Sequence, residues 1–370
     1  MSSNKFSRAG HRPDYFLLAL IFLLVVFGLA MLASASSDIG KMQFNDTYYY
    51  IKHQIYFGLS IGLLGFTAAY LFSYQHLRKF AFPLLIISLI CLALVFTPLG
   101  LNARNTSRWL RLGPLSFQPA ELMKLTFIIY LAAWFANTKI KRAKNIVEGL
   151  LPFGLLLGFV ILLLLLQPAT STVAILGISA LTVYWMSGAR FKHILFLMAG
   201  GLVIFAIVIY ATPYRRARIL GFLDPTADTQ GQNYQVNQAL IAIGSGGATG
   251  VGYGQSAAKA SYLPTPIDDS IFAVIGNELG FVGAGGLAVL FCMLVVRMFW
   301  LAVRTRDQFG KLLLIGFGMV IGLQAFVNMA SISGIIPLTG VPLPFVSYGG
   351  TALAIFLTMS GIAVNVSKYT

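Results

Sequence analysis

Stretches of about 20 apolar residues recur along the whole of this 370-residue chain, and they constrain its fold more than any other feature. A helix of that length crosses the hydrocarbon core of a bilayer. Hydrophobic residues make up 58% of the chain and charged residues only 10%, a balance that soluble globular domains do not show. We therefore expect an all-α polytopic membrane protein that forms a single integral membrane domain over residues 1–370.

The apolar stretches predict ten transmembrane helices. They lie at approximately 14–34, 53–73, 80–98, 118–136, 150–166, 172–188, 192–212, 269–297, 312–333 and 349–367. The first is followed by "ASASS", which resembles a signal-peptidase site, but the apolar run before it is longer than a secretory signal, so we interpret it as a membrane span. Cys91 and Cys292 lie within apolar runs, so we expect neither a disulfide framework nor a metal site from them.

Basic residues set the orientation. More than half of the 26 Lys and Arg residues fall in the N-terminal segment, in alternate connections and at the C-terminus. This excess predicts that both termini are cytoplasmic, and it attributes the net charge of +15 to topology rather than to nucleic-acid binding. The longest connection, residues 213–268, is then a large extracytoplasmic loop between helices 7 and 8.

Six arginines lie on the external side, against this bias: Arg104, Arg108, Arg111, Arg215, Arg216 and Arg218. Because the guanidinium group matches phosphate geometry, they indicate either an anionic ligand or contact with lipid headgroups. In the large loop, residues 235–244 predict a short amphipathic or re-entrant helix. The glycine-rich stretch 244–254 favours a tight turn over a phosphate cradle, since no Walker-type Lys-Ser/Thr follows it.

Charged residues within or beside apolar spans need a partner or a function, because burying a charge in a membrane is costly. Glu121 and Lys124 are spaced i, i+3, which predicts an ion pair on one helix face, with either a structural or a functional role. Asp268 and Asp269 stand before an apolar run, where one carboxylate serves as an ordinary N-cap and the other is a candidate general base. Spacing alone leaves open which does which.

The helix after these aspartates has two further features. Glu278 lies nine residues beyond Asp269 and therefore on a different helix face, with a different contact. Gly276 and Gly280 share the face of Asp269, and their GxxxG spacing predicts that another helix approaches closely there.

Four stretches stand out as motifs: "RWLRLGPLSFQPAELMK" (108–124), "YRRARILGFLDP" (214–225) leading into "NYQVNQALIAIGSGG" (233–247), "YLPTPIDDSIFAVIGNELGFVG" (262–283) and "GIIPLTGVPLPFVSYGGTAL" (334–353). They resemble the motifs of the SEDS family (shape, elongation, division and sporulation), the FtsW/RodA/SpoVE peptidoglycan glycosyltransferases. The motifs occur in the family's order, with "LASASS" after the first span.

The resemblance implies an enzyme that polymerises lipid II on the outer face of the bacterial cytoplasmic membrane, for cell division or elongation. Asp269 falls on the family's essential aspartate, which leaves Asp268 as the expected N-cap. Asp269 would activate the attacking hydroxyl, with inversion and release of undecaprenyl diphosphate. The resemblance places Glu121, Lys124, Arg108, Arg215, Arg216 and Gln238 at the substrate, and gives Asp268, Glu278 and Ser347 structural or secondary roles.

The implied partners are lipid II with its nascent glycan, a class B penicillin-binding protein and other division or elongation machinery. No metal-ligand spacing or cofactor motif is present, and a divalent cation beside the external acids stays an open alternative. Ala169 and Asn277 stand where the family often has acids. A lipid II flippase is the alternative function, since polytopic transporters also carry intramembrane ionisable residues; external clustering of the charges favours the enzyme.

Overall fold

A computed structural model describes residues 12–103, 106–112, 115–136, 142–224, 233–257 and 263–370 of the chain. Among these residues, a helix lies at each of the ten predicted transmembrane positions. In chain order they are α1 (Tyr15–Phe44), the continuous helix α2 (Tyr49–His53), η1 (Gln54–Leu59) and α3 (Ser60–Leu71), then α4 (Leu77–Leu94), α5 (Pro119–Phe135), α6 (Leu151–Leu166), α7 (Thr170–Met186), α8 (Phe191–Ala211), α12 (Ile271–Arg304), α13 (Gln308–Ile332) and α14 (Gly350–Ser367).

Eight of these helical segments, as described, are long and apolar enough to span a bilayer. The other two, α5 and α7, have 17 residues each. Short helical segments precede two of the spans. The 3-10 helix η2 (Tyr74–His76) precedes α4, and the 3-10 helix η3 (Arg142–Lys144) and the π-helical turn η4 (Ile146–Leu150) precede α6. The backbone N–H of Asp14 donates to Ser367 Oγ at 3.0 Å, so the start of α1 and the end of α14 lie at the same end of the bundle. This agrees with an even number of spans.

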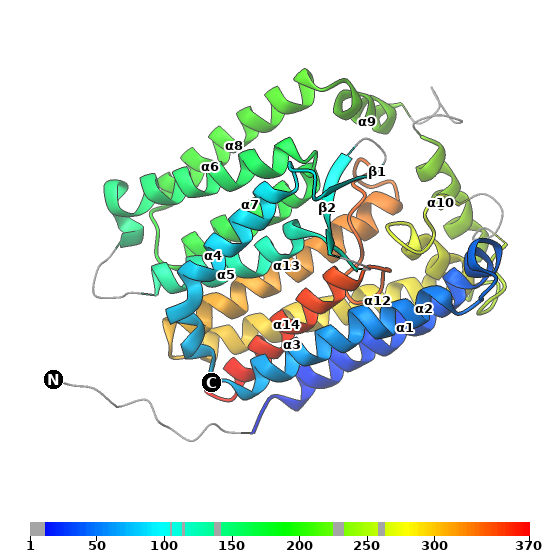
Figure 1. Cartoon of the computed structure of the whole chain (residues 1–370), viewed down its shortest axis with the longest axis horizontal. Coiled ribbons are helices and arrows are strands. Elements are labelled where there is room, and N and C mark those ends of the chain that lie inside the picture. Colours follow the sequence, from blue (N-terminus) through cyan, green and yellow to red (C-terminus); the bar gives the residue numbers. More distant parts are fainter. Residues whose placement is uncertain (1–11, 104–105, 113–114, 137–141, 225–232, 258–262) are drawn as a thin grey trace.

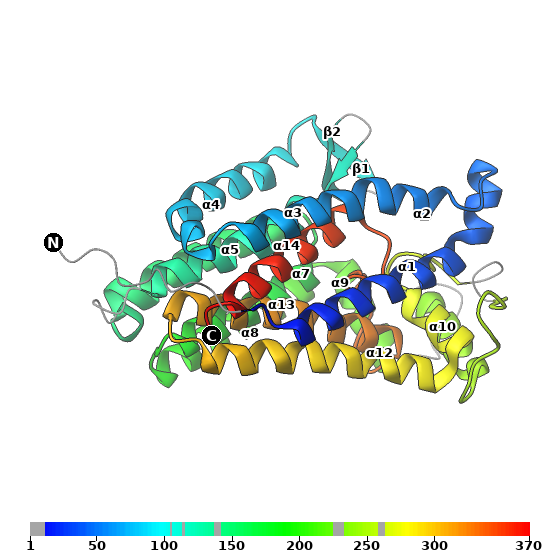
Figure 2. The ribbon, with the colours of Figure 1, turned by 90° about the horizontal axis from the view of Figure 1, so that it is seen from below.

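The helices form a central group surrounded by outer ones (Figures 1 and 2). In both views α14 lies in the middle of the bundle, where it packs against α3 and α13. In α14, 83% of the residues in an 18-residue apolar stretch are buried, whereas in the corresponding stretch of α8 only 6% are buried. Large apolar side chains on α8, such as Phe196, Leu202 and Ile207, are exposed. Such a surface requires an apolar solvent, so α8 faces the lipid.

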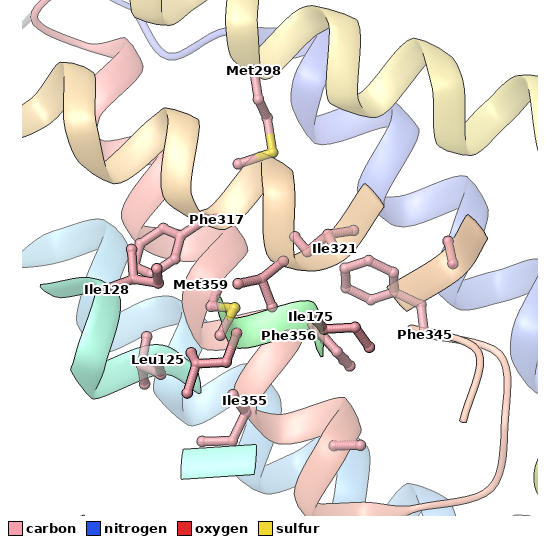
Figure 3. Close-up of a cluster of buried hydrophobic side chains, with 14 of the residues drawn as sticks. Leu125, Ile128, Ile175, Met298, Phe317, Ile321, Phe345, Ile355, Phe356 and Met359 are labelled. Carbon is pink, nitrogen blue, oxygen red and sulfur yellow. The ribbon is translucent and has the colours of Figure 1, made fainter. Parts of the chain in front are cut away.

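The core joins helices that are distant in sequence. Figure 3 shows Phe356 and Met359 of α14 meeting Phe317 and Ile321 of α13. Ile128 of α5 lies beside them, and all five side chains are 0% exposed. Because these interlocked side chains leave little freedom, the relative positions of α5, α13 and α14 are set by packing. Helices α5 and α13 carry polar residues of the site described below.

One end of the bundle carries the non-spanning elements, which lie together on the right in Figure 1. They are the strands β1 (Gly100–Ala103), β2 (Thr106–Leu112) and β3 (Leu115–Phe117), and the helices α9 (Pro213–Leu223) and α10 (Tyr234–Gly246). The strands form an antiparallel sheet in the order β1-β2-β3. The sequence analysis, which expected an all-α fold, did not predict this small sheet. The predicted short helix at 235–244 is confirmed as α10.

The GxxxG prediction is also confirmed, because α10 and the turn after it approach α12 at backbone distance. A Cβ built on Gly246 would lie 2.1 Å from the carbonyl oxygen of Gly276. Gly280 has a φ of 65°, which breaks the helical path of α12 at that residue. A Cβ there would meet the backbone N of Gly250 at 2.4 Å. Only glycine combines this conformation with this contact.

The glycine-rich stretch forms the tight turn that the sequence favoured. Gly247, Gly250, Gly252 and Gly254 all have positive φ. The amide groups of Gly250 and Gly252 donate to the carbonyls of Gly246 and Glu278 at 2.8 and 3.0 Å. These donors are therefore used to fasten the turn to α10 and α12 and do not form a phosphate cradle.

Candidate active site

The turn that precedes α12 carries Asp268 and Asp269. The carbonyl of Thr265 accepts from the backbone N–H groups of Asp268 and Ser270 at 3.2 and 3.3 Å. The N-cap position of α12 is held by Ser270, and its side chain makes no capping hydrogen bond. The expectation that Asp268 is the N-cap is therefore wrong. Both aspartates lie within the turn 266–270, and Ser270 separates Asp269 from the first residue of the helix.

Asp269 is half-buried, and both oxygens of its carboxylate accept hydrogen bonds from neutral side chains. The Thr265 hydroxyl donates to Oδ1. The Gln235 amide of α10 donates to Oδ2 at 3.2 Å. Gly340 lies beside the same carboxylate, since a Cβ built on this glycine would be 3.5 Å from Oδ2. The carboxylate is thus enclosed by α10, its own turn and the segment before α14.

Asp268 lies in a different environment. Its carbonyl accepts a hydrogen bond from the Ser347 hydroxyl, which also accepts from the backbone N–H of Leu343 at 2.8 Å. Burial and the neighbouring negative charges, Asp268 among them, raise the pKa of the Tyr348 phenol. The Tyr348 hydroxyl shares a hydrogen bond of 2.9 Å with His53 Nδ1. The two adjacent aspartates thus have separate partners, and Ser347 holds the backbone between them and α14.

The segment between α13 and α14 is held by two amides of α13. Asn328 Nδ2 donates to the carbonyls of Asp269 and Val341 at 2.8 and 2.7 Å. Gln324 Nε2 donates to the carbonyl of Pro342 at 3.0 Å. Gln324 and Asn328 are four residues apart and so share one helix face. This polar face ties the turn of Asp269 and the segment 341–342 to the core.

The predicted ion pair between Glu121 and Lys124 is present. Lys124 Nζ lies 2.7 Å from Glu121 Oε1, and both side chains are almost fully buried, at 1% and 3% exposed. Lys124 also donates to Gln324 Oε1. Within the described part of the chain, Glu121 Oε2 has no hydrogen-bond partner. The pair therefore belongs to the same polar network as Asn328 and Asp269, through Gln324 and the segment 341–342.

The predicted arginines lie at different places. Arg108 of β2 donates to the carbonyls of Gln167 and Pro168, the first at 3.0 Å. Arg215 of α9 donates to the carbonyl of Leu165 at 3.3 Å. Burial lowers the pKa of the Arg215 guanidinium. Both side chains thus converge on the C-terminal end of α6, where the helix dipole favours cations.

The other loop arginines differ again. Arg111 and Arg216 are exposed, and Arg104 lies outside the described residues. Arg218 donates to the carbonyl of Leu338 at 2.9 Å and lines a cavity of about 70 Å³ between α9, α10 and residues 334–338. Arg218 is thus tied to the segment that leads to Gly340.

Gln238 and Glu278, which the sequence also predicts as site residues, lie on α10 and α12. Gln238 is half-buried on α10, one turn beyond Gln235, and its predicted contact with substrate stays a prediction. Glu278 lies away from Asp269, as its helical phase indicated. It is 0% exposed, and the Ser34 hydroxyl of α1 lies 2.6 and 2.7 Å from its two oxygens. Glu278 therefore joins α12 to α1, which contains the "LASASS" stretch.

The two departures from the family pattern have distinct structural settings. Asn277 donates to the carbonyl of Ala242 at 2.9 Å and to Ser245 Oγ at 2.8 Å, so it fastens α10 to α12. An acid at this position has no proton to donate when ionised. Ala169 occupies the N-cap of α7, where it offers no side-chain acceptor.

The donor set does not fit a resident divalent cation. Among the described residues there is no group of three or more His, Cys, Asp or Glu side chains arranged to hold a metal. The divalent cation stays a prediction, and no step below depends on it.

Four residues of the site escaped the sequence prediction: Gln235, Thr265, Gln324 and Asn328. The sequence does contain a pattern that indicates Gln324 and Asn328: they are two amide side chains spaced i, i+4 within an apolar span, where they need buried hydrogen-bond partners. No sequence pattern distinguishes Gln235 and Thr265 from ordinary loop and surface residues.

Comparison with known proteins supports the resemblance. Residues 15–370 match the profile FTSW_RODA_SPOVE, described as cell cycle protein. A relative from Geobacter sulfurreducens, named probable peptidoglycan glycosyltransferase FtsW, is 36% identical over 358 residues, covering 96% of this chain and 95% of the relative. The stage V sporulation protein E of Bacillus subtilis is 35% identical, covering 97% of this chain and 98% of its own.

Solved structures agree. A chain from a peptidoglycan synthase complex that coordinates polymerization and crosslinking superposes with a TM-score of 0.79 at 32% identity, covering 97% of this chain and 99% of that one. The crystal structure of the rod shape determining protein RodA of Thermus thermophilus gives a TM-score of 0.71 at 29% identity, with 96% of each chain covered.

Proposed function

Because this chain belongs to the FtsW/RodA/SpoVE family and is a multi-pass membrane peptidoglycan glycosyltransferase, we propose that it polymerises lipid II with Asp269 as the general base. The observation that carries the proposal is the position of Asp269. Its half-buried carboxylate lies at the end of the bundle that carries α9, α10 and the sheet, beside the segment 340–342. The excess of basic residues in the other connections supports placing this end on the external side.

The proposed reaction joins two lipid-linked saccharides. Asp269 accepts the proton of the attacking hydroxyl of one substrate as the oxygen bonds to the anomeric carbon of the other. The bond from that carbon to the diphosphate oxygen breaks, so configuration inverts and undecaprenyl diphosphate leaves. The proton stays on Asp269 until it is released to solvent. A positioned general base contributes about 10²–10⁴-fold to such a step.

The leaving diphosphate gains negative charge, which nearby cations stabilise in the transition state. We assign this role to the predicted set of Lys124, Arg108, Arg215 and Arg216, with Glu121 orienting Lys124. Lys124 Nζ is held by Glu121 and Gln324 within the network that reaches the backbone of Asp269, which supports its inclusion in this set. Gln238 is assigned to saccharide contact by its place on α10.

A class B penicillin-binding protein is the proposed partner, because a neighbouring structure comes from a complex that couples polymerization to crosslinking. Such a partner would crosslink the glycan strands that this chain makes. Division, elongation and sporulation relatives share the fold, so the pathway served is a separate question.

The test is polymerisation of lipid II by the purified chain with its partner, whose transpeptidase is blocked by a β-lactam. We expect polymer from the wild type and at least about a 10²-fold slower rate from Asp269→Asn. A folded Asp269→Asn variant that polymerises at the wild-type rate contradicts the assignment of the base. Translocation of fluorescent lipid II across vesicles without polymerisation supports the flippase instead.

A further inference from the structure

The side-chain amide of Gln235 reaches the turn that carries the proposed base. Its Nε2 lies 3.2 Å from Asp269 Oδ2, 3.2 Å from Thr265 Oγ1 and 3.0 Å from Ser270 Oγ. One amide nitrogen has two hydrogens, so it supplies two of these three acceptors at a time. Gln235 is therefore the point at which α10 contacts the carboxylate and both hydroxyl residues of the turn.

Thr265 completes the arrangement in a strained conformation. Its hydroxyl donates to Asp269 Oδ1, while its φ of 46° lies in the left-handed region. That region is rare for a β-branched residue, and such strain persists where surrounding contacts enforce it. Here the enforcing contacts include the backbone hydrogen bonds from Asp268 and Ser270 and the amide of Gln235. The strained turn places one neutral donor on each carboxylate oxygen.

We propose that Gln235 is a positioning residue for Asp269, a proposal that rests on the proposed function. Each carboxylate oxygen offers two acceptor sites, so one hydrogen bond to each leaves a site on both for the substrate hydroxyl. Because both donors are neutral, they orient the carboxylate without placing a second charge beside it.

The helix that carries Gln235 is rigidly attached to the helix that follows Asp269. Gly246 of α10 approaches the Gly276 backbone of α12, and Asn277 donates to the carbonyl of Ala242 and to Ser245 Oγ. The amide and the carboxylate are thus supported by two helices in direct backbone contact. This is what a positioning residue requires, since small displacements of a catalytic group strongly reduce the rate.

The experiment compares Gln235→Ala and Gln235→Glu with the wild type in the lipid II polymerisation assay, over a range of substrate concentrations and pH. Asn237→Asp on the same helix is the matched control for adding a carboxylate to α10. We expect Gln235→Ala to lower kcat at least about tenfold with KM changed less than about threefold, because misplacing the base affects the chemical step.

Gln235→Glu preserves the shape and adds a carboxylate beside Asp269. A second negative charge disfavours the deprotonated base, so we expect the acid limb of the pH–rate profile to move to higher pH by about one unit. The other titratable and charged groups on the surrounding elements are present in every variant, so their effects on the pH–rate profile cancel in the comparison. They are Asp268 on the same turn, Tyr234 on α10, Tyr348 before α14 and Arg218 on α9. Asn237→Asp is expected to leave the profile unchanged.

The outcomes separate the two proposals. No polymer from the wild type, with an active partner supplied, overturns the proposed function itself. A wild-type rate that depends on Asp269, combined with an unchanged kcat in Gln235→Ala or an unmoved profile in Gln235→Glu, overturns the role of Gln235. Equal loss of thermal stability and of activity in both variants, with the profile unmoved, assigns Gln235 to folding alone.

Discussion

Asn328 holds the backbone of Asp269: its Nδ2 lies 2.8 Å from the Asp269 carbonyl and 2.7 Å from that of Val341. Asn328 and Asp269 are 59 positions apart in the sequence, and Asn328 is only 1% exposed. One residue in the middle of an apolar span thus fixes two segments that enclose the proposed base.

Replacing Asn328 with Leu is expected to reduce both stability and activity. The change leaves two buried carbonyls without a donor, at about 1–3 kcal/mol each, and frees the turn of Asp269. Thermal unfolding in detergent and the polymerisation rate measure the two effects.

Asn365→Leu is the matched control. Asn365 also makes two hydrogen bonds to backbone, with Tyr74 N at 3.0 Å and Tyr70 O at 2.7 Å, near the C-terminal end of α14. We expect a similar loss of stability with activity retained per folded molecule. Equal loss of activity in both variants contradicts a specific role of Asn328 at the site.

The buried pair of Glu121 and Lys124 is suited to a double-mutant cycle. Lys124→Met leaves a buried carboxylate without its cation and is expected to destabilise the protein by about 3–5 kcal/mol. Adding Glu121→Gln removes that charge, so the double variant should regain part of the stability.

Activity is expected to stay at least about tenfold low in the double variant, since the cation proposed to stabilise the diphosphate is absent. Stability is followed by thermal unfolding and activity by glycan formation. A double variant with wild-type activity would show that the pair serves only the structure.

Gly280→Ala tests the break in α12. The positive φ and the contact with the Gly250 backbone make any side chain unfavourable there, and we expect a loss of at least about 1–3 kcal/mol. Gly285→Ala in the same helix is the control. A Cβ at Gly285 meets nothing within 4 Å, so the higher helix propensity of Ala should stabilise by up to about 1 kcal/mol. Unfolding temperatures that fall equally in both variants contradict the special conformation of Gly280.

Ala169→Asp is expected to stabilise the protein. The residue occupies the N-cap of α7, where a carboxylate accepts from the first turn and contributes about 1 kcal/mol. Arg108 donates to the carbonyls of Gln167 and Pro168 next to it, so a favourable charge is already close. A higher unfolding temperature, compared with the uncharged Ala169→Leu, checks the prediction; no difference between the two contradicts it.

The spans were predictable because their causes are local. A run of apolar residues such as Tyr15–Leu32 must be helical in a bilayer whatever its neighbours are, and basic residues report the side on which each run ends. The small sheet was missed because strands as short as Leu115–Phe117 are stable only through their partners. Asp268 was misjudged as a cap because the turn at Thr265 depends on contacts with α10.

The sequence by itself determined the membrane fold, the ion pair of Glu121 and Lys124 and, through its resemblance to a family, the importance of Asp269. Only the tertiary structure decided what surrounds that carboxylate: Gln235, 34 positions away, and Asn328, 59 positions away. Hydrophobic runs and i, i+3 spacings act within one helix, and so can be read from the chain. Hydrogen bonds between helices depend on how the whole bundle packs, and no local pattern contains that information.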